Sequence, residues 1–137
     1  MKKLMALIIA LGMVFSAMTA FAADIKVVVN GEEMAFDREP MVENGVVFIP
    51  YRFVAEKLGA KISWHHETKT VFGEYEGKII TAQIGNNFVF VNDGMFTVEN
   101  APIINTDRTM VPLDVFVNGY GADASWDSEA SVVTIKK

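Results

Sequence analysis

The chain repeats its own pattern at a fixed distance of 62 residues, and this self-similarity limits the folds open to it. Residues 49–64 read IPYRFVAEKLGAKISW, and residues 111–126 read VPLDVFVNGYGADASW. The same shift aligns two prolines, a glycine and a tryptophan without a gap. Because chance does not align these residue types in one register, the sequence predicts two copies of one supersecondary unit, residues 25–77 and 86–137.

Each copy reads as short strands around one short helix. Asn30-Gly31 separates two strand-like runs, and both residue types tolerate the positive φ angles of a tight hairpin turn. Apolar residues between 51 and 58 follow the spacing of one helical face, and Gly59 suits the position just past a helix end. Residues 78–85 alternate as a bridging strand. Since a two-turn helix is marginal alone and 50 residues bury little core, we expect an α+β fold in which each copy is an antiparallel sheet wrapped around its helix and the copies pack together.

Turn, cap and aromatic positions are expected to define the unit. Trp64 and Trp126 share the phase of their strands with Ile62 and Ala124, which predicts core aromatics whose truncation costs about 3–5 kcal/mol. The alternative is that the two tryptophans are platforms for stacking sugars. The defining residues are Asn30, Gly31, Pro40, Pro50, Arg52, Glu56, Gly59 and Trp64 in the first copy, and Pro102, Pro112, Gly121 and Trp126 in the second.

Arg52 and Glu56 are the oppositely charged pair inside the repeated phrase. Their i, i+4 spacing predicts an ion pair on the helix surface, worth about 0.3–0.5 kcal/mol. Asp114 and Asn118 stand at the corresponding positions of the second copy, so the charges are not repeated. We interpret the pair as structural, with anion binding through Arg52 as the alternative.

The histidines offer a weak metal site. His65 and His66 are the only two in the chain, and adjacent residues of an extended segment point to opposite sides. Zinc normally takes three or four nitrogen or sulfur ligands, and the chain has no cysteine. We therefore expect surface turn residues, no metal and no cofactor, with metal binding through this pair as an alternative.

Reactive motifs are missing from the sequence. It holds no G-x-S-x-G elbow, no P-loop and no dinucleotide-binding glycine pattern. A Cys–His pair is impossible, whereas a Ser–His–Asp set or paired carboxylates stay open. The sequence thus favours a non-catalytic protein, with a small extracellular hydrolase using carboxylates as an alternative.

The first residues indicate export. Lys2 and Lys3 precede an apolar run, and Ala20-Phe21-Ala22 offers the small residues that a signal peptidase reads, which predicts a signal peptide at 1–22. Removing it leaves ten basic and 17 acidic residues. This acidic balance argues against nucleic-acid partners. We expect a single secreted or extracellular domain at 23–137, with no membrane span after cleavage and an unidentified partner in the cell wall or envelope.

The motif VxVNG, a proline, then P-x-R-x-x-A-E-x-L-G-A-x-x-x-W and T-K-T-V resembles a known family. It is similar to the copper amine oxidase N-terminal-like domain, or stalk domain, of secreted Gram-positive bacterial proteins. The first copy carries the whole pattern, whereas the second has no arginine or glutamate at the positions that correspond to Arg52 and Glu56. The resemblance covers residues 25–137 and implies an antiparallel sheet around a short helix.

The resemblance implies the stalk and not the oxidase. In the amine oxidases, copper and the tyrosine-derived quinone belong to a separate catalytic domain, which needs three histidine ligands. None of Tyr51, Tyr75 or Tyr120 lies in the Asn-Tyr-Asp/Glu context of the quinone precursor. The implied role is a structural or binding module at the cell surface, with no catalytic residue.

Overall fold

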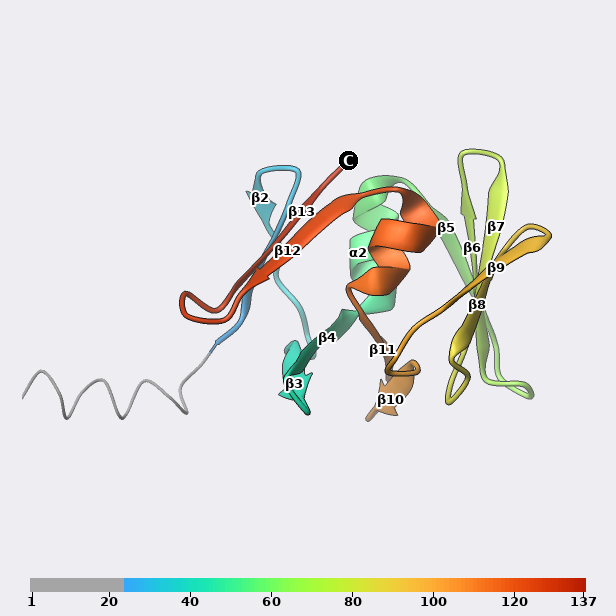
Figure 1. Ribbon diagram of the computed structural model, residues 1–137, viewed down its shortest axis with the longest axis horizontal. Helices are drawn as coiled ribbons and strands as arrows, with labels where there is room; N and C mark the ends of the chain where they lie inside the picture. The colour runs from blue at the N-terminus through green and yellow to red at the C-terminus, as the bar shows by residue number, and fades with distance from the viewer. Residues whose placement is uncertain (1–23) are drawn as a thin grey trace, which may run out of the picture.

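The computed structural model describes residues 24–137, and the predicted signal peptide at 1–22 lies outside them. Within that range, thirteen strands form three sheets, with one α-helix and one π-helical turn. Figure 1 shows the helix α2 (Tyr51–Leu58) and the turn η1 (Val115–Gly119) in the middle of the molecule, between one sheet on the left and another on the right. The fold is therefore α+β and rich in sheet, in agreement with the prediction.

Two outer sheets and one central sheet take strands from distant parts of the chain. Sheet A has the order β12-β13-β1-β2, sheet B the order β10-β11-β4-β3, and sheet C the order β5-β6-β7-β8-β9. The strands of sheet A are β1 (Lys26–Val29), β2 (Glu32–Glu33), β12 (Asp123–Asp127) and β13 (Val132–Lys136). Those of sheet B are β3 (Met41–Glu43), β4 (Val46–Pro50), β10 (Ile103–Asn105) and β11 (Arg108–Pro112). Those of sheet C are β5 (Lys61–His65), β6 (Thr70–Tyr75), β7 (Lys78–Gln83), β8 (Phe88–Val91) and β9 (Gly94–Thr97).

The expectation that each copy forms its own antiparallel sheet is wrong, because every sheet joins strands from both halves of the chain. In sheet A, β1 pairs with β13 in parallel, with Lys26 opposite Val132. In sheet B, β4 pairs with β11 so that Ile49 lies opposite Val111, the residue 62 positions later. A two-stranded hairpin is marginal in water, and sheets of four or five strands leave fewer edges unpaired.

Local signals in the first half are confirmed. Asn30 and Gly31 have φ angles of 50° and 84° in the turn between β1 and β2. Helix α2 ends at Gly59, whose φ of 108° is strained for any residue with a side chain. Pro50 lies at the N-cap, one residue before the expected first turn. The bridging strand exists as β7.

The second predicted helix is a five-residue π-helical turn, η1, and not a two-turn α-helix. Asn118 and Gly119 stand where α2 has Glu56 and Lys57. Both replacements lower helix propensity, and glycine costs about 1 kcal/mol relative to alanine. The second segment therefore keeps its buried apolar residues but not the α-helical geometry.

A cluster of aromatic side chains fills the space between the helices and sheet C. Tyr51 and Tyr120 are fully buried, and their hydroxyl groups share a hydrogen bond. The Tyr120 ring lies 5.0 Å from that of Tyr75 and 5.6 Å from that of Phe116, measured between centroids. Burial raises the pKa of Tyr51 well above its ordinary value and that of Tyr120 to about 12.

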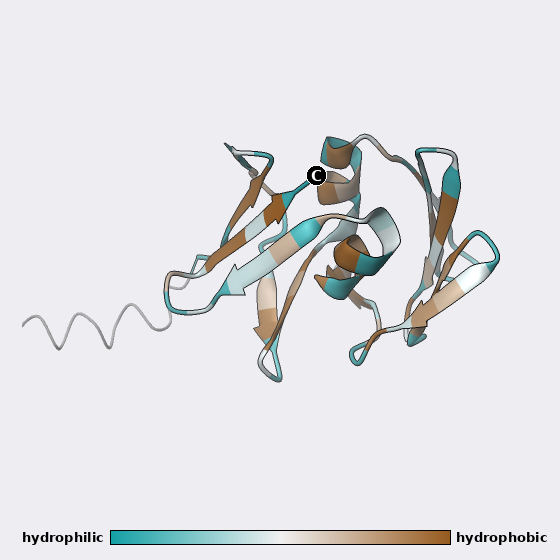
Figure 2. Ribbon diagram, turned by 45° about the horizontal axis from the view of Figure 1, so that its top comes forward, coloured by the Kyte–Doolittle hydropathy of each residue, from teal (hydrophilic) through white to brown (hydrophobic). Residues whose placement is uncertain are grey.

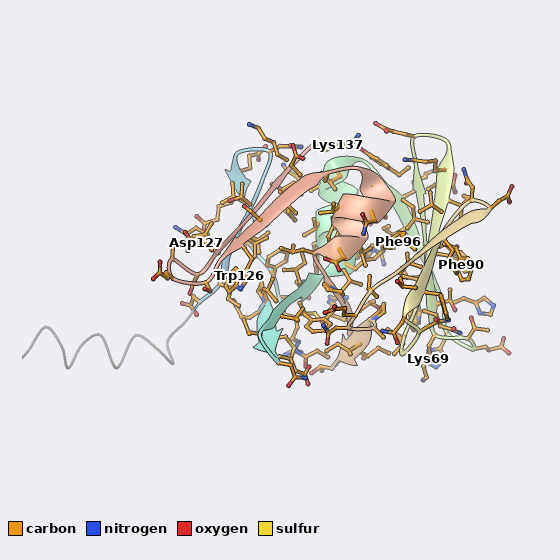
Figure 3. All side chains as sticks on the ribbon, viewed as in Figure 1. Lys69, Phe90, Phe96, Trp126, Asp127 and Lys137 are labelled. Atoms are coloured by element: carbon orange, nitrogen blue, oxygen red, sulfur yellow. The ribbon has the colours of Figure 1, made fainter. Side chains whose placement is uncertain are left out.

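Sheet C has a buried face toward the helices and an outer face that is unusually apolar. Figure 3 shows Phe96 directed toward η1 and Phe90 on the outer side of the sheet. Phe90 is 40% exposed, and Phe72, Phe88 and Met95 are also exposed. The hydropathy colours in Figure 2 show teal turns at the ends of the strands and brown stretches along the strands and helices.

Candidate functional site: a cleft beside Trp64

Trp64 lies at the surface with 40% of its area exposed, so the prediction that it is a core aromatic is wrong. Burial decreases toward the end of the edge strand β5, from Ala60, which is buried just before the strand, through half-buried Ile62 to exposed Trp64. The alternation correctly predicts that Trp64 shares a face of the strand with Ile62, but the strand extends past the helix that covers its first residues. Trp126 is half-buried and packs against the core, so it matches the prediction in part.

The Trp64 side chain forms part of a cleft of about 440 Å³ between sheet C, helix α2 and the β10–β11 hairpin. This volume lies in the range of small-molecule sites. The side chains from α2 and sheet C are apolar and aromatic with one cation, and those from the hairpin are polar. The lining residues are Tyr51, Arg52, Ile62, Trp64, His66 and Val71 on one side, and Ile104, Thr106, Asp107, Arg108 and Thr109 on the other.

Two arginines reach the cleft from opposite sides, and each is held by a carboxylate. Arg52 Nε donates to Glu56 Oε2 at 3.0 Å, as the i, i+4 spacing predicted. Arg108 donates through Nε and a terminal nitrogen to both oxygens of Asp37. A guanidinium carries five N–H donors, so these pairs fix the two groups without using all their donors.

The pair between Arg108 and Asp37 changes how both groups titrate. The hydrogen bond from Arg108 lowers the pKa of Asp37, and the same bond raises the pKa of Arg108. Arg108 also stacks on the Phe53 ring, with its guanidinium carbon 5.3 Å from the ring centroid. Its planar group is therefore oriented at the rim of the cleft.

Thr106, at the tip of the β10–β11 hairpin, has a φ of 57°. This left-handed conformation is uncommon for a β-branched residue. Asn44, 62 residues earlier, has nearly the same angle, 54°, and asparagine tolerates it well. Strain of this kind persists where the surroundings require it, and such positions gather at binding sites.

A second, smaller cleft of about 260 Å³ is lined by the residues 62 positions away from several of these. It keeps a tryptophan, Trp126, but Asp114 stands in the place of Arg52 and Val46 in the place of Arg108. Glu99 adds another carboxylate. The two clefts, built from residues 62 positions apart, therefore carry opposite charge.

The two histidines have different neighbours in the structure. His65 Nδ1 lies 3.0 Å from Thr68 Oγ1, whereas the His66 ring lies 6.4 Å from the Trp64 ring at the cleft. Within residues 24–137, no three His, Cys, Asp or Glu side chains gather closely enough to hold a metal ion.

The structure brings Arg52, Trp64 and His66 together, and it adds Asp107 and Arg108, which sequence reasoning missed. A sequence signal for Arg108 exists, because Arg108 and Thr109 stand in a strand whose counterpart, 62 residues earlier, reads Val-Val. Most of the other predicted positions lie away from the cleft, at prolines and turns. Pro40, Pro50, Pro102 and Pro112 are buried, whereas Asn30, Gly31, Gly59 and Gly121 are exposed at turns or next to helix ends.

The fold and the cleft define a sheet-rich module with an open aromatic and charged surface. Among the residues lining the cleft, Asp107 is the only carboxylate, whereas glycoside hydrolysis ordinarily uses two. No helix within residues 24–137 is long and apolar enough to cross a membrane.

The model of the copper amine oxidase N-terminal domain family matches residues 28–135. This match covers most of the chain, which therefore belongs to that family, and the resemblance read from the sequence is confirmed. The N-terminal domain of the copper amine oxidases is non-catalytic, which is consistent with a structural module. No curated protein matches the chain.

Proposed function

We propose that this protein is a secreted, non-catalytic module that binds a component of the cell envelope through the cleft beside Trp64. The observation that carries the proposal is Trp64 itself, a large aromatic side chain that is 40% exposed in a cleft also lined by two arginines. Folding alone favours burying tryptophan, so its exposure beside oriented polar groups points to a ligand.

The absence of catalysis is supported by the family and by the chemistry of the cleft. Its lining has one carboxylate, and the His66 ring lies 6.4 Å from the Trp64 ring. Arg52 and Arg108 are suited to orienting a bound group, since guanidinium does not exchange protons near neutral pH.

Secretion and envelope association rest on the sequence. The predicted signal peptide at 1–22 leads to export, and the acidic chain has no cysteine. Mass spectrometry of the protein recovered from culture medium tests this directly. We expect a mature N-terminus at Ala23, whereas a retained Met1 in the exported protein would refute cleavage.

We infer further that the two halves are copies of one unit. This is supported by the 62-residue offset between their strands, as in β3 and β10 or β5 and β12. Duplication supplies two clefts at corresponding positions, and the two clefts differ in charge.

The test of function is binding of the purified protein to intact cell walls and to peptidoglycan, with and without divalent metal. We expect saturable binding that Trp64→Ala reduces at least tenfold. Phe90→Ala is the matched control, because Phe90 is equally exposed but lies on the outer face of sheet C. Equal binding by the Trp64→Ala variant would reject the cleft as the binding surface, and absence of binding to any wall fraction would reject envelope association.

A further inference from the structure

We propose that the cleft beside Trp64 recognises a sugar ring that carries a carboxylate group. This inference rests on the proposed binding function and specifies the ligand of the same site. It follows from three features: an apolar floor with an exposed indole, two oriented guanidinium groups, and a second cleft that lacks those groups.

The apolar floor fits one face of a pyranose ring. Trp64 is accompanied by half-buried Ile62 and by buried Val71, and Val71 pairs directly with Trp64 across the sheet. The C–H groups on one face of a sugar pack on an aromatic plane, while its hydroxyl groups stay at the edge in contact with polar side chains. At about 440 Å³ the cleft has room for a small saccharide.

The polar rim fits a carboxylate together with hydroxyl groups. Arg52 uses Nε for Glu56, so both of its terminal nitrogens remain as donors. Arg108 is fixed by Asp37 and Phe53 and also keeps free N–H groups. Guanidinium binds carboxylate in a bidentate geometry that a lysine cannot reproduce. Asp107 can accept hydrogen bonds from sugar hydroxyls.

The surrounding charge favours a short ligand over a long polyanion. The chain carries a net charge of −5, and Glu56 and Asp37 lie beside the two arginines. A long acidic polymer is repelled by this field, whereas a single carboxylate placed between the guanidinium groups is not. Recognition therefore depends on local geometry and not on general attraction.

The second cleft serves as an internal comparison. It keeps the tryptophan, as Trp126, yet it offers Asp114 and Glu99 where a carboxylate ligand would need cations. Asp114 and Val46 occupy the positions that correspond to Arg52 and Arg108. The arginines are thus a property of the first cleft alone.

The experiment compares trigalacturonate with its methyl ester, which keeps the rings and removes the charge. Binding is followed by tryptophan fluorescence in the Trp126→Phe variant, in which Trp64 is the sole tryptophan, and by calorimetry with the unmodified protein. We expect the acid to bind at least tenfold more tightly than the ester. Arg52→Asp, which copies the second cleft, should abolish this preference, and thermal unfolding verifies that the variant is folded. Asp114→Arg is the reciprocal control and should leave binding at Trp64 unchanged.

Each outcome of this experiment either supports or overturns the inference. Preference for the acid that is lost in Arg52→Asp supports the inference. Equal binding of acid and ester, or a preference that survives Arg52→Asp, overturns it. If neither sugar binds while the protein still binds cell walls, the ligand class is wrong and the proposed function stands. If the protein binds neither sugars nor walls, the proposed function fails as well.

Discussion

Replacing Gly73 by alanine tests the packing between sheet C and the buried tyrosines. A Cβ atom at Gly73 would lie 2.5 Å from the Tyr120 hydroxyl and 2.8 Å from the Tyr51 hydroxyl. Both rings are fully buried and cannot move aside without disturbing the core. Overpacking of this kind costs about 1–3 kcal/mol. For a domain of this size, each kcal/mol corresponds to about 4 °C in Tm, so we expect a decrease of about 4–12 °C.

A mutant cycle separates this clash from a general intolerance of side chains. Tyr51→Phe with Tyr120→Phe removes both hydroxyls, and apolar replacement of both partners of a hydrogen bond is nearly neutral. In that background Gly73→Ala should cost less than half as much in urea denaturation. Gly94→Ala is the matched control, since this strand glycine has ordinary space around it, with its nearest contact at 3.4 Å. A penalty at Gly73 that is unchanged without the hydroxyls would refute the reasoning.

Four further predictions follow from the same structure. The contribution of Tyr120 to the free energy of unfolding should be constant below pH 10 and decrease toward pH 12. The reason is that the unfolded chain loses the Tyr120 proton first, while burial keeps that pKa at about 12 in the fold. Urea denaturation between pH 9 and pH 12 should show a flatter profile for Tyr120→Phe. Arg108→Gln should raise the pKa of Asp37 toward its usual value near 3.8, measured by NMR titration, and no shift would contradict the hydrogen bond between them. Thr106→Asn should stabilise the protein by about 1 kcal/mol by relieving the positive φ angle, and a loss in thermal stability would refute that strain. Trp64→Ala should cost less than about 1.5 kcal/mol, since the side chain is 40% exposed, and a loss above about 3 kcal/mol would restore the core interpretation.

Local features of the fold could be predicted from the sequence, whereas the pairing of strands into sheets could not. The Asn30-Gly31 turn, helix α2 and its end at Gly59 depend on neighbouring residues, and each is confirmed. Which strands share a sheet depends on contacts between distant segments, such as β1 with β13. Alternation within a strand gives the face of a residue but not the length of the helix that covers it.

The candidate site also combines residues that the local sequence indicates with residues that only the fold brings near. Arg52 and Trp64 could be singled out because they stand in a patterned phrase, but Asp107 and Arg108 belong to a hairpin more than 40 residues away. Only the three-dimensional arrangement brings that hairpin against β5. Comparing residues 62 positions apart marks Arg108 as a departure from an apolar strand. It does not indicate that Arg108 lines the same cleft as Trp64.

The parallel pairing of β1 with β13 also determines when this protein can fold during its synthesis. β1 is the first strand of the described chain and β13 the last, and between them they form the middle of sheet A. A nascent chain that lacks β13 leaves β1 with only the two-residue strand β2 beside it, so sheet A cannot close until β13 has been synthesised. Contacts between such distant segments make folding slow. Sheet A is therefore completed late in folding, and a chain truncated before β13 should leave β1 as an exposed edge.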